Sequence, residues 1–89
     1  MANTKKAKET TAKERLERLE TEYDEVAERL SRLNKSLFKD TEKERKAFLK
    51  KVGQEQYALL DEQQGYMTAY RDTLAKRIQL FKFEHKGEL

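Results

Sequence analysis

Residues 16–37 have the sequence LERLETEYDEVAERLSRLNKSL, in which apolar residues recur at alternating spacings of three and four. This heptad spacing places the apolar residues on one narrow stripe of an α-helix. Glutamate and arginine occupy the flanking positions and can pair at i,i+3 or i,i+4. We therefore predict a long amphipathic helix that packs against another helix. Its stripe comprises Leu16, Leu19, Tyr23, Val26, Leu30, Leu33 and Leu37.

A second apolar stripe predicts another long helix over residues 54–81. Gln63 is polar within this stripe, as expected of an amide that bonds across a helix interface or faces a wet pocket between subunits. Gly65 costs about 1 kcal/mol relative to alanine, so it indicates close approach of another backbone or of a ligand. The stripe comprises Leu60, Gln63, Met67, Tyr70, Leu74, Ile78 and Phe81, with Tyr57, Leu59 and Tyr66 alongside.

The residues between these helices are predicted to form a short helix with its own N-terminal and C-terminal capping signals. Thr41 followed by Glu44 is a capping-box pattern, and Gly53 is suited to a left-handed C-terminal cap because it has no Cβ. The buried side of this short helix is expected to come from Ala47, Phe48, Leu49 and Val52. The predicted fold class is all-α: a bent hairpin of two long helices joined by a short helical elbow.

The flanks differ in composition from this helical domain, which we place at residues 13–81. Residues 1–12 are polar and have no apolar periodicity, so we predict a flexible N-terminal arm. Residues 82–89 are predicted to be a frayed C-terminal tail.

Composition limits the function classes. A chain of 89 residues with 42% charged residues has a marginal core, and the absence of cysteine excludes disulfides, so association into a homo-oligomer is the favoured remedy. A single histidine, His85, makes a metal site improbable, and no catalytic motif is recognisable, so no enzyme activity and no cofactor are expected.

No apolar run predicts a membrane span or an export signal, which leaves the cytoplasm as the expected location. The net charge of +3 is weaker than that of a typical nucleic-acid domain, and interspersed glutamates disfavour a DNA or RNA polymer.

Cations and aromatic rings on the two long helices form a candidate surface for an anionic, planar ligand. An arginine can bind a phosphate through two parallel hydrogen bonds, and a tyrosine can stack on a nucleobase. The alternative from the same pattern is a coiled-coil-like structural or interaction module, in which arginines pair with glutamates and tyrosines pack in the core. The candidates are Arg29, Arg32 and Lys35 on the first helix, and Tyr66, Tyr70, Arg71 and Arg77 on the last.

The segment from Leu59 to Ile78, Leu-Leu-x-x-Gln-x-x-x-Met-x-x-Tyr-x-x-x-Leu-x-x-Arg-Ile, resembles the phage anti-CBASS sponges, and the likeness extends over residues 14–81. The resemblance implies a bent-helix subunit that assembles into a homohexamer in the host cytoplasm. It further implies capture, without hydrolysis, of cyclic dinucleotides between subunits and of cyclic trinucleotides at separate three-fold sites.

The resemblance also implies roles for particular residues. Arg29 or Arg32 falls near the family's dinucleotide-binding lysine, and Arg77 or Arg71 matches an arginine expected at the trinucleotide site. The family's early tyrosine has no counterpart among residues 14–17, so stacking would come from Tyr23, Phe38 or another residue.

Overall fold

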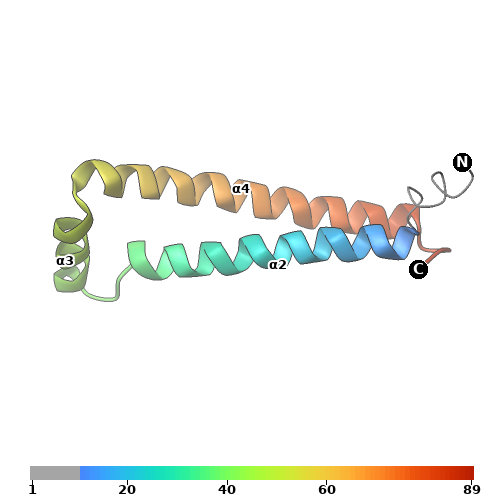
Figure 1. Cartoon of the computed structure of the whole chain (residues 1–89), viewed down its shortest axis with the longest axis horizontal. Coiled ribbons are helices and arrows are strands. Elements are labelled where there is room, and N and C mark those ends of the chain that lie inside the picture. The colour runs from blue at the N-terminus through green and yellow to red at the C-terminus, as the bar shows by residue number, and fades with distance from the viewer. Residues whose placement is uncertain (1–10) are drawn as a thin grey trace, which may run out of the picture.

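The structure is a computed structural model that describes residues 11–89 as an antiparallel helical hairpin with a short helix across one end (Figure 1). Its elements are α2 (Ala12–Leu37), α3 (Glu42–Val52) and α4 (Gln54–Glu84), and the described residues contain no strand. The predicted all-α hairpin with its helical elbow is therefore confirmed, whereas assembly into an oligomer remains a prediction. Most of the expected N-terminal arm lies outside the described residues. The described helices span Ala12 to Glu84, against the expected domain of residues 13–81.

Short-range capping signals set the helix boundaries. Thr11 accepts a hydrogen bond from the Glu14 amide at 3.1 Å and starts α2, and Thr41 accepts one from the Glu44 amide at 3.1 Å and starts α3. The N-cap predicted at Thr41 is thus confirmed, and the Glu44 carboxylate accepts a hydrogen bond from the Thr41 hydroxyl at 3.1 Å. Gly53 separates α3 from α4 with φ 90° and ψ 151°, a region open almost only to glycine, as its predicted capping role requires.

The core is a thin layer between α2 and α4. The buried side chains are Ala12, Val26, Leu30 and Leu37 from α2 and Leu74 from α4. The remaining members of the predicted α2 stripe are half-buried, so that stripe does face α4. No side chain of α3 is fully buried, and Ala47, expected on its buried side, is exposed.

The predicted stripe on α4 needs a correction at two positions. Gln63 and Tyr70 are exposed, and the half-buried neighbours Gln64 and Arg71 take the inward positions. An α-helix turns 100° per residue, so a shift of one residue rotates a side chain away from α2. No atom of residues 11–89 lies within 4 Å of a Cβ built on Gly65, so the described part of the chain does not make the close approach expected there.

Two contacts of Tyr57 stabilise the elbow. The rings of Phe48 and Tyr57 meet edge to face with centroids 6.1 Å apart, which joins α3 to α4. The Tyr57 hydroxyl donates to the Leu37 carbonyl at 3.3 Å, which joins the start of α4 to the end of α2. The elbow therefore fixes how the two long helices face one another.

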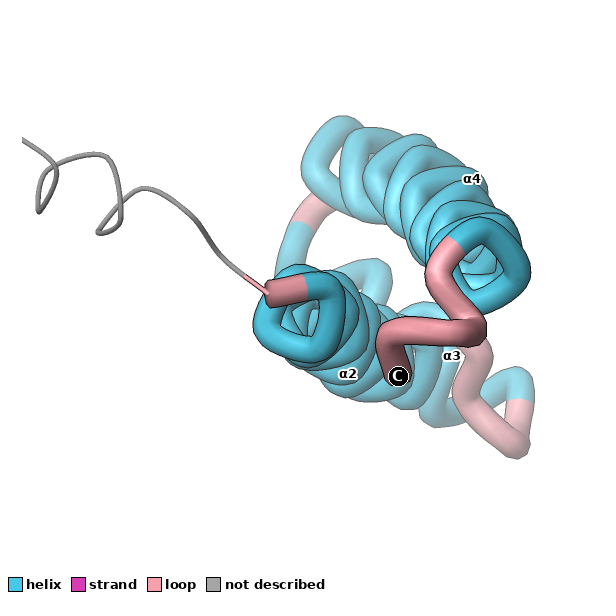
Figure 2. Tube along the Cα trace, turned by 90° about the vertical axis from the view of Figure 1, so that its right-hand side faces the viewer, coloured by secondary structure: helices cyan, strands magenta, loops and turns pink. Residues whose placement is uncertain are grey.

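The hairpin is elongated and has only two layers. Its extents are 60 × 29 × 15 Å, and its radius of gyration is 19.2 Å, whereas a compact domain of this length would have about 12 Å. Seen along its length, α2 and α4 lie side by side with no third layer over them (Figure 2). Most apolar positions outside the thin core consequently remain on the surface.

Candidate functional site

A hollow between α2 and α4, near the elbow, collects three of the residues predicted from the sequence. Its volume is about 460 Å³. We call it the Lys35–Arg71 hollow. It is lined by Ala27, Leu30, Ser31, Asn34, Lys35, Phe38 and Arg71.

Each functional side chain of this hollow has a local reason for its position. Lys35 lies in the last turn of α2, and Phe38 directly follows that helix, where its amide still donates to the Asn34 carbonyl at 2.8 Å. Because Phe38 has left the helical conformation, its ring is not held in the α2 seam and is 58% exposed. Arg71 reaches the hollow from the inward side of α4.

The two cations differ in how far they are already neutralised. The Arg71 guanidinium contacts the carboxylate of Asp72 at 3.1 and 3.3 Å. No carboxylate of residues 11–89 lies within 4 Å of the Lys35 ammonium. The hollow therefore has a net positive lining that attracts an anion, since a surface cation without a counterion gains most from binding one.

Asn34 adds an unsatisfied polar atom to the same hollow. Its Oδ1 is buried and has no hydrogen-bond partner among residues 11–89. A buried acceptor without a partner is costly, and rotation of the Asn34 amide toward the hollow would let a ligand donor relieve that cost. The exocyclic amine of a nucleobase is such a donor.

The end of α2 orients a ligand in this hollow. Terminal carbonyls give a helix C-terminus a partial negative charge, which disfavours a phosphate beside Phe38. The Tyr57 hydroxyl satisfies one of those carbonyls, that of Leu37. An anionic group is consequently better placed toward Arg71 on α4 than beside Phe38.

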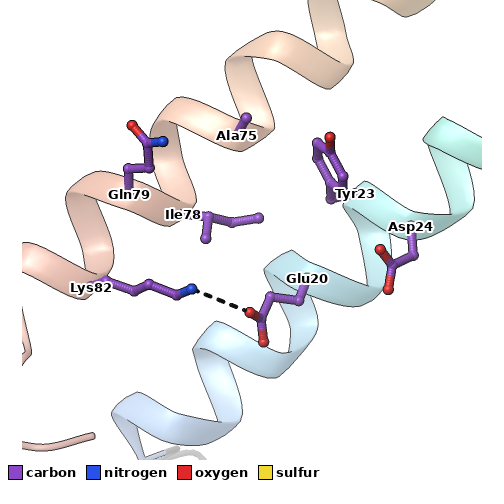
Figure 3. A pocket seen from close by; sticks show the side chains of 7 residues that line it. All are labelled: Glu20, Tyr23, Asp24, Ala75, Ile78, Gln79 and Lys82. Atoms are coloured by element: carbon purple, nitrogen blue, oxygen red, sulfur yellow. Dashed lines mark ion pairs between the residues drawn. The ribbon is translucent and has the colours of Figure 1, made fainter.

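Tyr23 lies in a different and larger hollow of about 570 Å³, nearer the chain termini. Figure 3 shows Tyr23 pointing from α2 toward α4, with the carboxylates of Glu20 and Asp24 on the same helix. The Lys82 ammonium that could offset these charges is 3.7 Å from Glu20. The larger hollow is therefore less suited to an anion than the Lys35–Arg71 hollow.

Arg77 lines a third hollow, of about 300 Å³, together with Arg15, Arg18, Leu19, Glu22 and Phe81. The Arg15 guanidinium lies 5.6 Å from the centroid of the Phe81 ring. None of the three arginines has a carboxylate of residues 11–89 within 4 Å. This cluster is a second place that could hold a phosphate.

The other predicted residues, Arg29, Arg32, Tyr66 and Tyr70, lie on exposed helix surface outside these three hollows. Arg32 pairs with Glu28 at 2.7 Å, and the Tyr66 hydroxyl donates to Glu62 at 2.9 Å. Within one chain, the structure thus brings together Lys35, Phe38 and Arg71 and leaves the remaining candidates apart.

The sequence interpretation missed Asn34 in the first hollow and Arg15 and Arg18 in the third. Asn34 had a detectable signal, because an asparagine beside the apolar seam of a helix is expected to need a partner. Arg15 and Arg18 lie three residues apart on α2, but their link to Arg77 depends on the antiparallel alignment of α2 with α4.

Two further classes of site receive no support from the described part of the chain. No group of three or more histidine, cysteine or carboxylate side chains within residues 11–89 is placed to hold a metal ion. No described helix is both long and apolar enough to cross a membrane.

Comparison with known proteins gives one match. The family model described as Sequestin matches residues 13–80, a segment that contains nearly all of the helical hairpin. The chain matches none of the curated proteins and none of the solved structures.

Proposed function

Because the chain belongs to the Sequestin family, we propose that it sequesters a nucleotide second messenger and does not convert it. The family name denotes capture, which is a binding activity. The ligands we propose are the cyclic dinucleotides and cyclic trinucleotides of bacterial CBASS immunity, as the resemblance to phage anti-CBASS sponges implies. Capture in the cytoplasm of an infected bacterium would then block the antiphage response.

The observation that carries this proposal is the content of the Lys35–Arg71 hollow. It combines two cations, an exposed aromatic ring and the unpartnered oxygen of Asn34. These groups match the three parts of a nucleotide that proteins commonly recognise, namely the phosphate, the base face and the base edge. Sequestration needs nothing more, because a ligand that is only held requires no acid, base or nucleophile.

Isothermal titration of the purified full chain against cyclic dinucleotides and cyclic trinucleotides tests the proposal. We expect Arg71→Ala to weaken binding by about 10-fold or more, since a hydrogen bond to a charged group contributes about 1.5–3 kcal/mol. Phe38→Ala should weaken binding by a similar factor through lost stacking. Arg45→Ala is the matched control, because Arg45 is an exposed arginine on α3 that lies outside the hollow and is not among the predicted ligand residues.

Recovery of the ligand distinguishes capture from turnover. After denaturation of the complex, mass spectrometry should return the cyclic nucleotide intact and in the amount bound. A linear product would refute sequestration. Binding that is lost equally in the Arg45 and Arg71 variants would refute the assignment of the hollow.

The alternative function is a helical structural or interaction module without a nucleotide ligand. The observation that favours it is the exposed apolar surface of α4, formed by Leu59, Tyr66, Tyr70 and Leu80, which suits a protein partner. A titration panel that includes mononucleotides and pyrophosphate-linked dinucleotides separates the cases. If a mononucleotide or a pyrophosphate-linked dinucleotide binds and the cyclic nucleotides do not, the protein would still sequester a ligand, but a different messenger. If no nucleotide of the panel binds, the result would support the structural module.

A further inference from the structure

Asp72 is an acidic residue beside the cationic side of the Lys35–Arg71 hollow. Its Oδ1 accepts hydrogen bonds from Nε of Arg71 at 3.3 Å and from Nη2 at 3.1 Å. Adjacent side chains on a helix do not normally face each other, because they point about 100° apart. The long arginine side chain therefore reaches around α4 to this carboxylate. Among residues 11–89, Asp72 has no other cation within 4 Å.

We propose that Asp72 is a specificity-determining residue, which makes the hollow disfavour phosphate monoesters relative to phosphodiesters. Asp72 can act in this way only if the hollow binds a phosphate, as the proposed function requires. The ligand class that follows is a nucleotide whose phosphates all form diester links. Cyclic oligonucleotides belong to this class, whereas mononucleotides and linear oligonucleotides with a terminal phosphate do not.

The hydrogen bonds to Asp72 leave room for a phosphate on the same guanidinium. An arginine has five N–H donors, and Asp72 accepts one hydrogen from Nε and one from Nη2. Both contacts reach a single oxygen, so they cover one edge of the guanidinium and leave the two donors of Nη1 for a ligand. The Arg71 side chain is 34% exposed, so a ligand can reach it. Asp72 therefore acts through its charge and not by blocking the arginine.

The charges at the hollow match those of one phosphodiester. Lys35 and Arg71 supply two positive charges and Asp72 one negative charge, which leaves a single net positive charge. A phosphodiester has one negative charge, whereas a phosphate monoester has about 1.5 to 2 at pH 7. The additional charge of a monoester gains less from the two cations, because Asp72 repels it.

The repulsion from Asp72 is large enough to measure. A phosphate oxygen bound to the free donors of Arg71 lies within about 8 Å of Oδ1 of Asp72, because each N–H···O contact is about 3 Å long. This distance is about one Debye length at physiological salt, so dissolved ions screen the repulsion only in part. With an effective dielectric constant of about 40, Coulomb's law gives a change in affinity of about 2-fold or more per unit of ligand charge.

Methyl esters of phosphate test the role of charge without a nucleobase. Trimethyl phosphate is neutral, dimethyl phosphate has one negative charge, and methyl phosphate has about two at pH 8. Titration of the full chain at constant ionic strength, followed by the NMR signal of Arg71 Nε, measures their dissociation constants. Asp72→Asn keeps an oxygen acceptor for Arg71 and removes the charge. It should tighten binding of dimethyl phosphate by about 2-fold or more and of methyl phosphate by about 4-fold or more, and leave trimethyl phosphate unchanged.

Two further variants separate the charge of Asp72 from a positioning role. Asp61→Asn is the matched control, because Asp61 is also an exposed aspartate of α4 and lies about 15 Å along the helix from Arg71. It should leave all three dissociation constants unchanged. Asp72→Ala removes the acceptor as well as the charge, and it should tighten binding of the charged esters as Asp72→Asn does. Weaker binding in Asp72→Ala than in wild type would show that Asp72 only positions Arg71, and would overturn the proposal.

3′,5′-Cyclic AMP and 5′-AMP extend the test to nucleotides, since they share one base and have one phosphate each, as a diester and as a monoester. In Asp72→Asn, affinity for 5′-AMP relative to 3′,5′-cyclic AMP should rise by about 2-fold or more. An unchanged ratio, in a protein that binds cyclic dinucleotides or cyclic trinucleotides, would overturn the role of Asp72 and retain the proposed function. If no cyclic nucleotide binds wild type, the proposed function fails, and the methyl esters still decide whether Asp72 selects against monoesters. Failure of dimethyl phosphate to shift the Arg71 signal in wild type and in Asp72→Asn would also overturn the role of Asp72.

Discussion

Replacement of Leu74 by alanine tests whether the thin layer between α2 and α4 is the core of the hairpin. Leu74 is the only buried residue that α4 contributes, and it is fully inaccessible to solvent. A buried leucine truncated to alanine loses about 2–5 kcal/mol, through lost burial and the cavity that remains. A two-layer hairpin can partly close such a cavity, so we expect a loss of about 3 kcal/mol within this range.

That loss is large compared with the total free energy of unfolding of the chain. A chain of this length has about 4–13 kcal/mol of stability, so Leu74→Ala should remove a substantial share of it. The melting temperature should fall by about 12–24 °C, given about 4–8 °C per kcal/mol for a domain of this size. Thermal and urea unfolding followed by circular dichroism measure both quantities. Wild type and variant must be compared at one protein concentration, because association adds to apparent stability.

Phe38→Ala provides the control. It removes a larger side chain, but one that is 58% exposed and lies outside the buried layer between α2 and α4. We expect it to change stability by less than about 1 kcal/mol, since exposed substitutions rarely have large effects. A loss below about 1 kcal/mol for Leu74→Ala, or equal losses in the two variants, would refute the assigned core.

Two further predictions concern the connections and the helix interior. Gly53→Ala should lower the free energy of unfolding by about 1–3 kcal/mol, because φ 90° strains any residue with a Cβ. Gly65→Ala should instead raise it by up to about 1 kcal/mol, because no atom of residues 11–89 lies within 4 Å of the added carbon. Chemical denaturation measures the stability of both variants. Equal effects would contradict the different backbone conformations described for Gly53 and Gly65. Thr41→Ala should lose about 1 kcal/mol with the cap on the Glu44 amide, and Thr41→Ser should retain most of that stability. An alanine variant as stable as wild type would show that the cap is not formed.

The sequence by itself determined the three helices and the signals that bound α3, whereas α4 continues to Glu84, beyond the predicted end at residue 81. Thr41 with Glu44 and the glycine at 53 act over three or four residues, so their effect does not depend on the rest of the fold. The inward stripe of α2 was equally predictable, because its flanks are almost wholly charged and leave one apolar face.

Only the tertiary structure decided which residues point inward in the middle of α4, at positions 63–64 and 70–71. This helix has apolar residues on two adjacent heptad stripes, and periodicity alone cannot choose between stripes that differ by one residue. Contact with α2 placed Arg71, and not Tyr70, at the inward position and left Tyr66 and Tyr70 exposed. The meeting of Lys35 and Phe38 with Arg71 has the same origin, since residues more than thirty positions apart become neighbours only when the elbow fixes how the two helices align.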